Sequence, residues 1–108
     1  MEAKLTRDTE FFGKMDPYVK IKYRSDEFKT PVKDEAGFTP VWNFTCVIDI
    51  KYIGDDIELV CKDKDVMSSD IVGNCTLKAS ALCVPGGLDD WFEIHFKGKS
   101  AGKIHLKS

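Results

Sequence analysis

The sequence predicts an all-β domain built from two packed antiparallel sheets. Three observations lead to this prediction: short stretches of alternating apolar and polar residues, turn-forming residues between them, and no long helical period. Alternation places successive side chains on opposite faces of a strand, so one face can be buried while the other meets water. Repeated along 108 residues, this pattern is typical of a single β-sandwich domain.

Seven stretches are predicted to be strands. The longest alternation lies in residues 41–50, where every second side chain from Trp42 onward is apolar. Pro31 places the second stretch at a sheet edge or a bulge. Residues 80–84 are predicted to form one helical turn. In chain order, the predicted strands are residues 18–24, 28–32, 41–50, 57–62, 72–78, 91–97 and 103–107.

Turn-forming residues separate these stretches at the spacing expected of an antiparallel sandwich. No linker, internal repeat or low-complexity tract interrupts the chain, so residues 1–108 are predicted to form one domain. The predicted turns are residues 25–26, 34–40, 54–55, 85–87 and 97–99.

Composition excludes several classes of function. The formal net charge of −2 is too close to zero to favour nucleic-acid binding. The chain has neither a membrane-spanning apolar run nor a signal-peptide pattern, which favours a cytosolic protein. It also lacks a serine–histidine–acid set, a glycine-rich phosphate loop and zinc-ligand spacing, so no enzyme activity is expected. The four cysteines are predicted to be small buried residues in strands, not disulfides or zinc ligands.

Two short acidic segments carry most of the functional information. One is residues 13–18, which contains Asp16, and the other is residues 63–73, which contains Asp63, Asp65 and Asp70. Each lies between predicted strands, so each is expected to be a loop at a strand end. If the fold brings these loops together, their carboxylates repel one another unless a cation lies among them. Oxygen ligands from loops suit a hard ion, Ca²⁺ above all.

The same segments resemble a known family. Residues 12–21, Phe-Gly-Lys-Met-Asp-Pro-Tyr-Val-Lys-Ile, resemble the first calcium-binding loop of C2 domains. Lys-Thr at 29–30, followed by Pro-Val-Trp-Asn at 40–43, is similar to the family's K-T…P-x-W-N pattern. The Asp-x-Asp at 63–65, followed by Asp-Ile-Val-Gly at 70–73, resembles its third loop.

The matches occur in the right order over nearly the whole chain. Residues 91–107 resemble the closing strands of the circular variant in which the G-x-I-x-L strand comes last. Similarity is greatest to small stand-alone plant and protist modules. The resemblance implies an eight-stranded, Greek-key β-sandwich.

The resemblance also implies a calcium site. Asp16, Asp63, Asp65 and Asp70 take ligand roles by their motif positions. The remaining ligand of the first loop is Asp8 or Glu10. Asp8 fits members with a longer first loop and is favoured, whereas Glu10 fits the commoner spacing. The simpler alternative is that these aspartates only cap turns.

The function implied is reversible, calcium-dependent binding of anionic phospholipid membranes, with relocation from the cytoplasm when calcium rises. Apolar residues at the loop tips would insert into the membrane, although Phe12 could instead pack beneath its loop. Lysines of the early strands would contact phosphoinositides, or would simply be solvated. The residues expected at the membrane are Phe11, Phe12, Val66, Met67, Lys20, Lys22 and Lys29.

Two features depart from the family pattern. The chain starts, at residues 1–5, with the end of the family's first strand or the turn after it, so that strand is truncated, missing or supplied by another chain. Unpaired strand edges favour self-association. The third loop is also about one residue shorter than in many members. The alternative function is therefore a calcium-independent module that binds a protein through its sheet face or an exposed edge. In a calcium-insensitive variant of the site, Lys64 and Arg7 would partly replace the charge of the ion.

Overall fold

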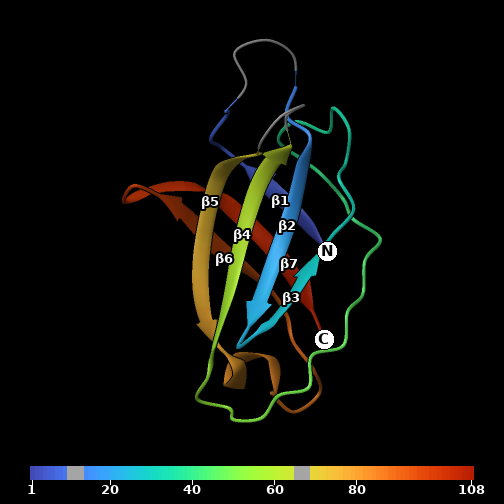
Figure 1. The fold of residues 1–108 in the computed structure, drawn as a ribbon, viewed down its shortest axis with the longest axis vertical. Coiled ribbons are helices and arrows are strands. Elements are labelled where there is room, and N and C mark those ends of the chain that lie inside the picture. Colours follow the sequence, from blue (N-terminus) through green and yellow to red (C-terminus); the bar gives the residue numbers. More distant parts are fainter. Residues whose placement is uncertain (10–13, 65–68) are drawn as a thin grey trace.

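The computed structural model describes residues 1–9, 14–64 and 69–108, and its described strands form one antiparallel sheet that folds over into two layers (Figure 1). The sheet order is β1-β7-β6-β5-β4-β2-β3. The elements are β1 (Glu2–Leu5), β2 (Pro17–Tyr23), β3 (Asp26–Lys29), β4 (Asp56–Lys64), β5 (Ser69–Lys78), the 3₁₀ helix η1 (Ala79–Leu82), β6 (Asp89–Phe96) and β7 (Lys99–Lys107).

The sheet folds between β5 and β6. These two strands are joined by a single residue pair, Asn74 with His95, whereas the other neighbours pair over longer ladders. Strands β6, β7 and β1 therefore form one layer behind β5, β4, β2 and β3 (Figure 1). The β6–β7 hairpin is closed by Lys97 and Gly98, both with positive φ, which matches the twist of the strands it joins. The prediction of an all-β, two-layered antiparallel domain is confirmed.

Most of the predicted strands are also confirmed, with shifted ends. Strand β3 ends before Pro31, because proline cannot donate to a ladder. Strands β4, β5 and β7 are longer than predicted, since backbone pairing continues beyond the alternating stretches into polar and small residues and Ile71. The predicted helical turn is η1. No helix in the described part of the chain is long and apolar enough to cross a membrane.

The prediction of a strand over residues 41–50 is wrong. The expected alternation is present, because Trp42 is buried and the side chains of Phe44, Cys46, Ile48 and Ile50 are half-buried against the core. However, among the described residues only the isolated bridge between Glu2 and Val41 pairs this segment. Next to this bridge, the amide of Trp42 donates to the carbonyl of Met1 at 2.7 Å, and no described segment pairs with residues 43–50.

Residues at the start of the chain form the four-residue strand β1. It pairs with β7 from Glu2, opposite His105, to Leu5, opposite Gly102. On its other edge, the amide of Ala3 donates to the carbonyl of Pro40 at 3.0 Å. At Gly102, φ is +125°, and a Cβ would collide with the carbonyl oxygen of Lys4, so only glycine allows this close approach.

The core lies between the two layers. Trp42 is 1% exposed, and its indole Nε1 donates to the carbonyl of Pro17 at 3.2 Å, which ties the unpaired segment to the start of β2. Trp42 therefore anchors this segment in the core. Of the cysteines, Cys61 is fully buried as predicted, and no described thiol forms a disulfide. Cys83 is exposed, contrary to prediction, because it follows η1 and lies in no strand.

Tyr23 organises the end of the sheet opposite the acidic loops. Its side chain is 1% exposed, and its hydroxyl donates to Oδ2 of Asp55 at 2.6 Å while accepting from the amide of Lys51 at 2.8 Å. Arg24 Nε donates to the same carboxylate at 2.8 Å. The hydrogen bond from Tyr23, and then that from Arg24, lower the pKa of Asp55.

We predict that Tyr23→Phe lowers the free energy of unfolding by about 1–3 kcal/mol, because it leaves the Lys51 amide without its buried acceptor. It also raises the pKa of Asp55. A carboxyl group whose pKa is lower in the folded state than in the unfolded state stabilises the fold at pH values above the unfolded-state pKa. This contribution is lost as the pH falls through the folded-state pKa. The loss of stability below about pH 4 should therefore be smaller in the variant, as urea titrations at pH 7 and pH 3 can measure.

The matched control is Tyr52→Phe, because the Tyr52 side chain is 63% exposed. This control should leave the midpoint of urea unfolding unchanged at both pH values. Equal stability of Tyr23→Phe and the native chain would contradict the role given to the Tyr23 hydroxyl.

Candidate functional site

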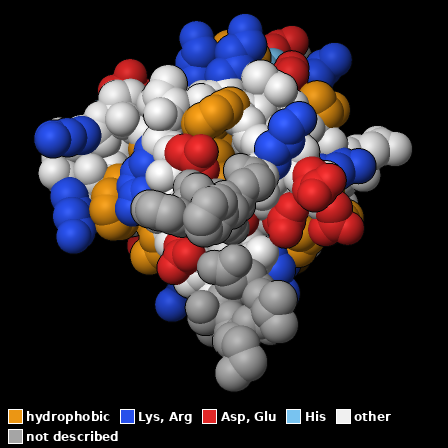
Figure 2. Space-filling view, turned by 90° about the horizontal axis from the view of Figure 1, so that it is seen from above, with side chains coloured by type: hydrophobic (Ala, Val, Ile, Leu, Met, Phe, Trp, Pro, Cys, Tyr) orange, Lys and Arg blue, Asp and Glu red, His pale blue; other side chains and the backbone are white. Residues whose placement is uncertain are grey.

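Three neighbouring strands bring acidic residues to one end of the sheet. Asp16 immediately precedes β2, Asp63 is the penultimate residue of β4, and Asp70 is the second residue of β5. In the ladders, Pro17 lies opposite Asp63, and Asp63 lies opposite Asp70. Directly opposed residues project to the same side of a sheet. Figure 2 looks onto this end of the molecule and shows acidic side chains gathered there.

Asp63 is the buried centre of this end. Its side chain is 0% exposed, and both carboxylate oxygens accept hydrogen bonds. Oδ1 accepts from the amide of Asp16 at 2.8 Å, and Oδ2 accepts from the hydroxyl of Thr9 at 2.7 Å. A buried charge is tolerated only with such partners. The carboxylate therefore joins the segment after β1, the start of β2 and the end of β4.

Asp16 is held in place from two sides. Its Oδ1 accepts a hydrogen bond of 2.6 Å from the amide of Glu35, in the segment that follows β3. Its backbone carbonyl accepts a 3.0 Å bond from the amide of Lys64. Pro17 follows at once, and its fixed φ sets the direction in which the chain enters β2. Asp16 is half-buried, so its carboxylate still borders solvent.

A β-bulge between β4 and β5 sets the direction of the Asp63 and Asp70 side chains. The register between β4 and β5 shifts after Cys61, so that Lys62 pairs with Ile71 and Asp63 with Asp70. Bulges bend a strand and redirect its side chains. Beside them, the hydroxyl of Tyr18 donates to Ser69 Oγ at 3.0 Å, which links β2 to the start of β5.

The predicted ligands are brought together only in part. Asp8 is exposed and adjoins Thr9, so its segment is drawn toward Asp63. In the described part of the chain, no three carboxylate, histidine or cysteine side chains are close enough to hold a metal. Several predicted site residues lie outside the described residues: Glu10, Phe11, Phe12, Asp65, Val66 and Met67.

The donor set nevertheless fits a hard cation. The described candidates offer only oxygen atoms, which calcium prefers. The one buried thiol nearby cannot compete, because burial, and then the charge of Asp63, raise the pKa of Cys61 to about 12. The thiolate is the form that binds metals, so this shift disfavours Cys61 as a ligand beside the carboxylates.

Two residues of this end were missed by sequence reasoning. Thr9 bonds Asp63 from 54 positions away, and Glu35 acts through its backbone amide, which any residue type carries. Only the Asp8-Thr9 pair beside the acidic loop could have given a signal.

Arg7, predicted to replace part of the ion's charge, lies with its guanidinium carbon 3.8 Å from the ring centroid of Phe96.

The predicted basic face is not uniformly positive. Lys20 and Lys29 lie opposite each other on β2 and β3, but Glu27 lies 3.4 Å from Lys20 Nζ and 3.7 Å from Lys29 Nζ. Lys22 lies between Glu27 and Glu58 in the two ladders. These lysines therefore share a face with carboxylates that cancel much of their field.

Comparison with known proteins agrees with this geometry. The family profile described as "C2 domain" matches residues 1–94. Over 96 residues the chain is 30% identical to extended synaptotagmin-1 of Homo sapiens, covering 88% of this chain but 8% of that protein. Over 89 residues it is 32% identical to 16 kDa phloem protein 2 of Arabidopsis thaliana, covering 82% of this chain and 60% of that protein.

Solved structures agree as well. The first C2 domain (domain A) of a plant extended synaptotagmin 1 superimposes with a TM-score of 0.82 at 25% identity, covering 98% of this chain and 85% of that one. A calcium-bound structure of the paired C2 domains, A and B, of extended synaptotagmin 2 gives a TM-score of 0.80 at 25% identity, covering 99% of this chain and 41% of that one.

The fold and the acidic strand ends define a small β-sandwich binding module. The chain belongs to the C2 domain family. It is homologous to the calcium- and lipid-binding domains of synaptotagmin type, and C2 domains are non-catalytic binding modules.

We predict that Asp63→Asn loses little of the stability of the fold, whereas Asp63→Ala loses much more. Asparagine retains one acceptor for the Asp16 amide, and its NH₂ can donate to the Thr9 hydroxyl, so the loss should be about 1 kcal/mol or less. Alanine leaves both donors without partners, at about 1–3 kcal/mol each. Urea unfolding without calcium measures both values. Equal losses for the two variants would contradict the hydrogen-bonding role.

Proposed function

We propose that this domain binds anionic phospholipid membranes reversibly and in a calcium-dependent manner, through the acidic loops at the ends of β2, β4 and β5. The observation that carries this proposal is the direct register of Asp16-Pro17, Asp63 and Asp70 across three adjacent strands. Asp8, next to Thr9, and Asp65, which follows Lys64 in the sequence and lies outside the described residues, complete the proposed ligand set.

The chain's own residues prepare the site electrostatically. Asp63 is fixed by two hydrogen bonds, and Asp16 by one, so these carboxylates hold their positions without spending side-chain entropy when a cation arrives. Asp70 is exposed at the rim. Bound Ca²⁺ would supply positive charge and open coordination positions for phosphate oxygens. Anionic lipid and calcium then strengthen each other's binding by the same factor.

The proposed membrane contact extends to the loop tips. Phe11, Phe12, Val66 and Met67 adjoin the acidic residues in sequence and would enter the headgroup–acyl boundary. The protein would then move from the cytoplasm to membranes when calcium rises.

We predict that Asp63→Asn abolishes calcium-dependent co-sedimentation with vesicles of phosphatidylserine and phosphatidylcholine. The loss in calcium affinity should exceed the roughly 10- to 100-fold that removal of an outer-shell partner costs. The control is Asp26→Asn, which makes the same charge change at the exposed β2–β3 turn. Unchanged co-sedimentation of Asp63→Asn, with the control also unchanged, would overturn the assignment of the site.

Phosphoinositide binding by the face of β2 and β3 is a secondary part of the proposal. Glu27→Gln removes the carboxylate shared by Lys20 and Lys29, so it should strengthen binding to phosphoinositide vesicles by about fivefold at low salt. Lys20→Ala with Lys29→Ala should weaken it. The measurement is vesicle titration in chelator, at matched ionic strength. If neither change alters the affinity, this face does not contact the lipid.

A further inference from the structure

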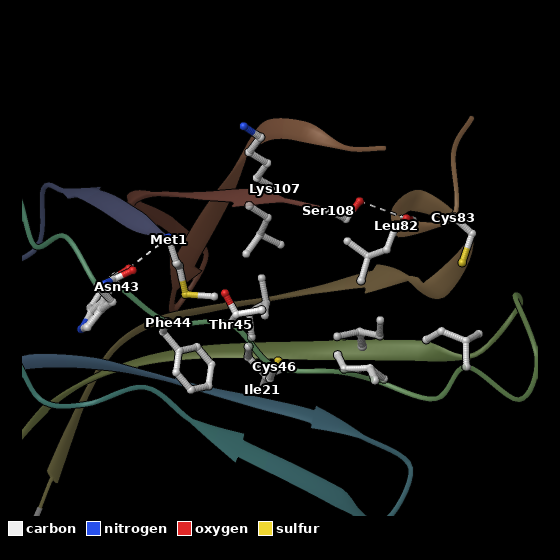
Figure 3. A pocket seen from close by; sticks show the side chains of 16 residues that line it. Met1, Ile21, Asn43, Phe44, Thr45, Cys46, Leu82, Cys83, Lys107 and Ser108 are labelled. Atoms are coloured by element: carbon white, nitrogen blue, oxygen red, sulfur yellow. Dashed lines mark hydrogen bonds between the residues drawn. The ribbon is translucent and has the colours of Figure 1, made fainter. Parts of the chain in front are cut away.

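The outer face of the layer formed by β6, β7 and β1 carries two lysines that lie directly opposite each other. Lys4 of β1 pairs with Lys103 of β7, and both side chains are exposed, whereas their chain neighbours Ala3 and Ile104 are buried. The inner face of the same layer is turned toward the core, where Leu106 lines the pocket shown in Figure 3. Like charges directly opposite each other destabilise a sheet, so this pair should attract an anion.

A second opposed lysine pair in the same sheet shows how such a pair can be neutralised. Lys20 and Lys29 lie opposite each other on β2 and β3, and the carboxylate of Glu27 lies 3.4 Å from one ammonium group and 3.7 Å from the other. One glutamate thus bridges both charges. In the described part of the chain, no carboxylate lies within ion-pair distance of Lys4 or Lys103.

Trp91 of β6 gathers the two ammonium groups of the Lys4–Lys103 pair. The Nζ atom of Lys4 lies 5.0 Å from the centroid of the Trp91 ring, and that of Lys103 lies 5.3 Å from it. An aromatic face attracts a cation by about 0.5–1 kcal/mol at an exposed site. The ring carries no net charge, however, so it holds the ammonium groups near one another without neutralising either of them.

The carboxylates of β6 on this face are paired with histidines. Asp89 Oδ1 lies 2.5 Å from Nε2 of His105, and Glu93 Oε1 lies 2.7 Å from Nε2 of His95. Glu93 stands opposite Lys103 in the ladder between β6 and β7, yet its carboxylate is directed to the histidine. These carboxylates therefore border the lysine pair without bridging it.

From this arrangement we infer that the outer face of β1, β6 and β7 binds a segment of a partner protein, in which one glutamate or aspartate bridges Lys4 and Lys103. Its carboxylate takes the place that Glu27 has in the other pair. An extended segment laid along β7 advances about 7 Å over two residues, which reaches the level of His105. There the Trp91 and His105 rings lie with centroids 5.1 Å apart. The partner residue two positions from the acid is therefore apolar.

The surrounding charges limit the partner to an isolated acidic residue. Glu2 lies opposite His105, Asp89 is paired with the same histidine, and Glu93 lies opposite Lys103. A run of acidic residues, or a continuous anionic lipid surface, would bring negative charge against these three carboxylates. A single carboxylate with neutral neighbours avoids this repulsion, which favours a protein segment over a membrane.

The test uses the isotope-labelled domain in chelator and the synthetic peptide Ser-Glu-Ser-Phe-Ser, with both of its ends blocked. We expect a saturable NMR shift of the indole N–H of Trp91. The indole of Trp42, which is 1% exposed, is the internal reference and should not shift. The peptide with glutamine in place of glutamate should bind at least about fivefold more weakly. The peptide with a second glutamate in place of phenylalanine should also bind more weakly, although it is more acidic.

Two double variants show whether the lysine pair recognises the carboxylate. Lys4→Gln with Lys103→Gln should lower the affinity for the glutamate peptide to that for the glutamine peptide, and should leave the affinity for the glutamine peptide unchanged. The matched control is Lys51→Gln with Lys78→Gln, which removes the same charge from side chains that are 57% and 62% exposed and lie outside β1, β6 and β7. This control should bind both peptides as the native domain does.

Three results would overturn the inference. Equal affinity of the native domain for the glutamate and glutamine peptides would show that no carboxylate is recognised. Tighter binding of the peptide with two glutamates, or co-sedimentation with phosphatidylserine vesicles in chelator that depends on Lys4 and Lys103, would make this face a general surface for anions or membranes. Absence of a saturable shift of the Trp91 resonance up to millimolar peptide would show that the face binds no such segment.

Discussion

The buried carboxylate of Asp63 is the constraint on which the functional end of this domain depends. Its two oxygens hold the Asp16 amide and the Thr9 hydroxyl, so one side chain joins three segments that are far apart in sequence. Because the group is 0% exposed, removing its partners would leave a charge without compensation. The positions of the surrounding acidic loops therefore follow from the ladder β2-β4-β5, in which Asp63 is central.

The two layers of the sandwich differ in how far their described residues are paired. Strands β2, β4 and β5 pair along their lengths and carry the acidic residues at one end. The other layer ends at β1, and beyond it the segment 43–50 packs its alternate side chains against the core without a ladder. The calcium site proposed here rests on the layer of β2, β4 and β5, whose strands pair along their lengths.

The strands could be predicted because alternating apolar and polar side chains indicate which face of a strand is buried, and this alternation is visible in the local sequence. The prediction failed for residues 41–50 for the same reason: the side chains alternate as expected, but hydrogen bonding requires a neighbour that the local pattern cannot reveal. The site was predicted from the aspartates, whose chemistry is visible in their residue type. Thr9 and the Glu35 amide were not, since their roles arise from long-range packing. The charge balance of the lysine face could not be predicted, because the register that places Glu27 opposite Lys22 and close to Lys20 and Lys29 was unknown.

The most direct measurement is thermal unfolding of the domain in chelator, then in millimolar Mg²⁺, and then in millimolar Ca²⁺. A ligand that binds only the folded state raises the unfolding midpoint. If the acidic strand ends form a calcium site, the midpoint should rise by at least about 4 °C with Ca²⁺ and stay at the chelator value with Mg²⁺. The same midpoint in all three conditions, with anionic vesicles present as well, would contradict the account.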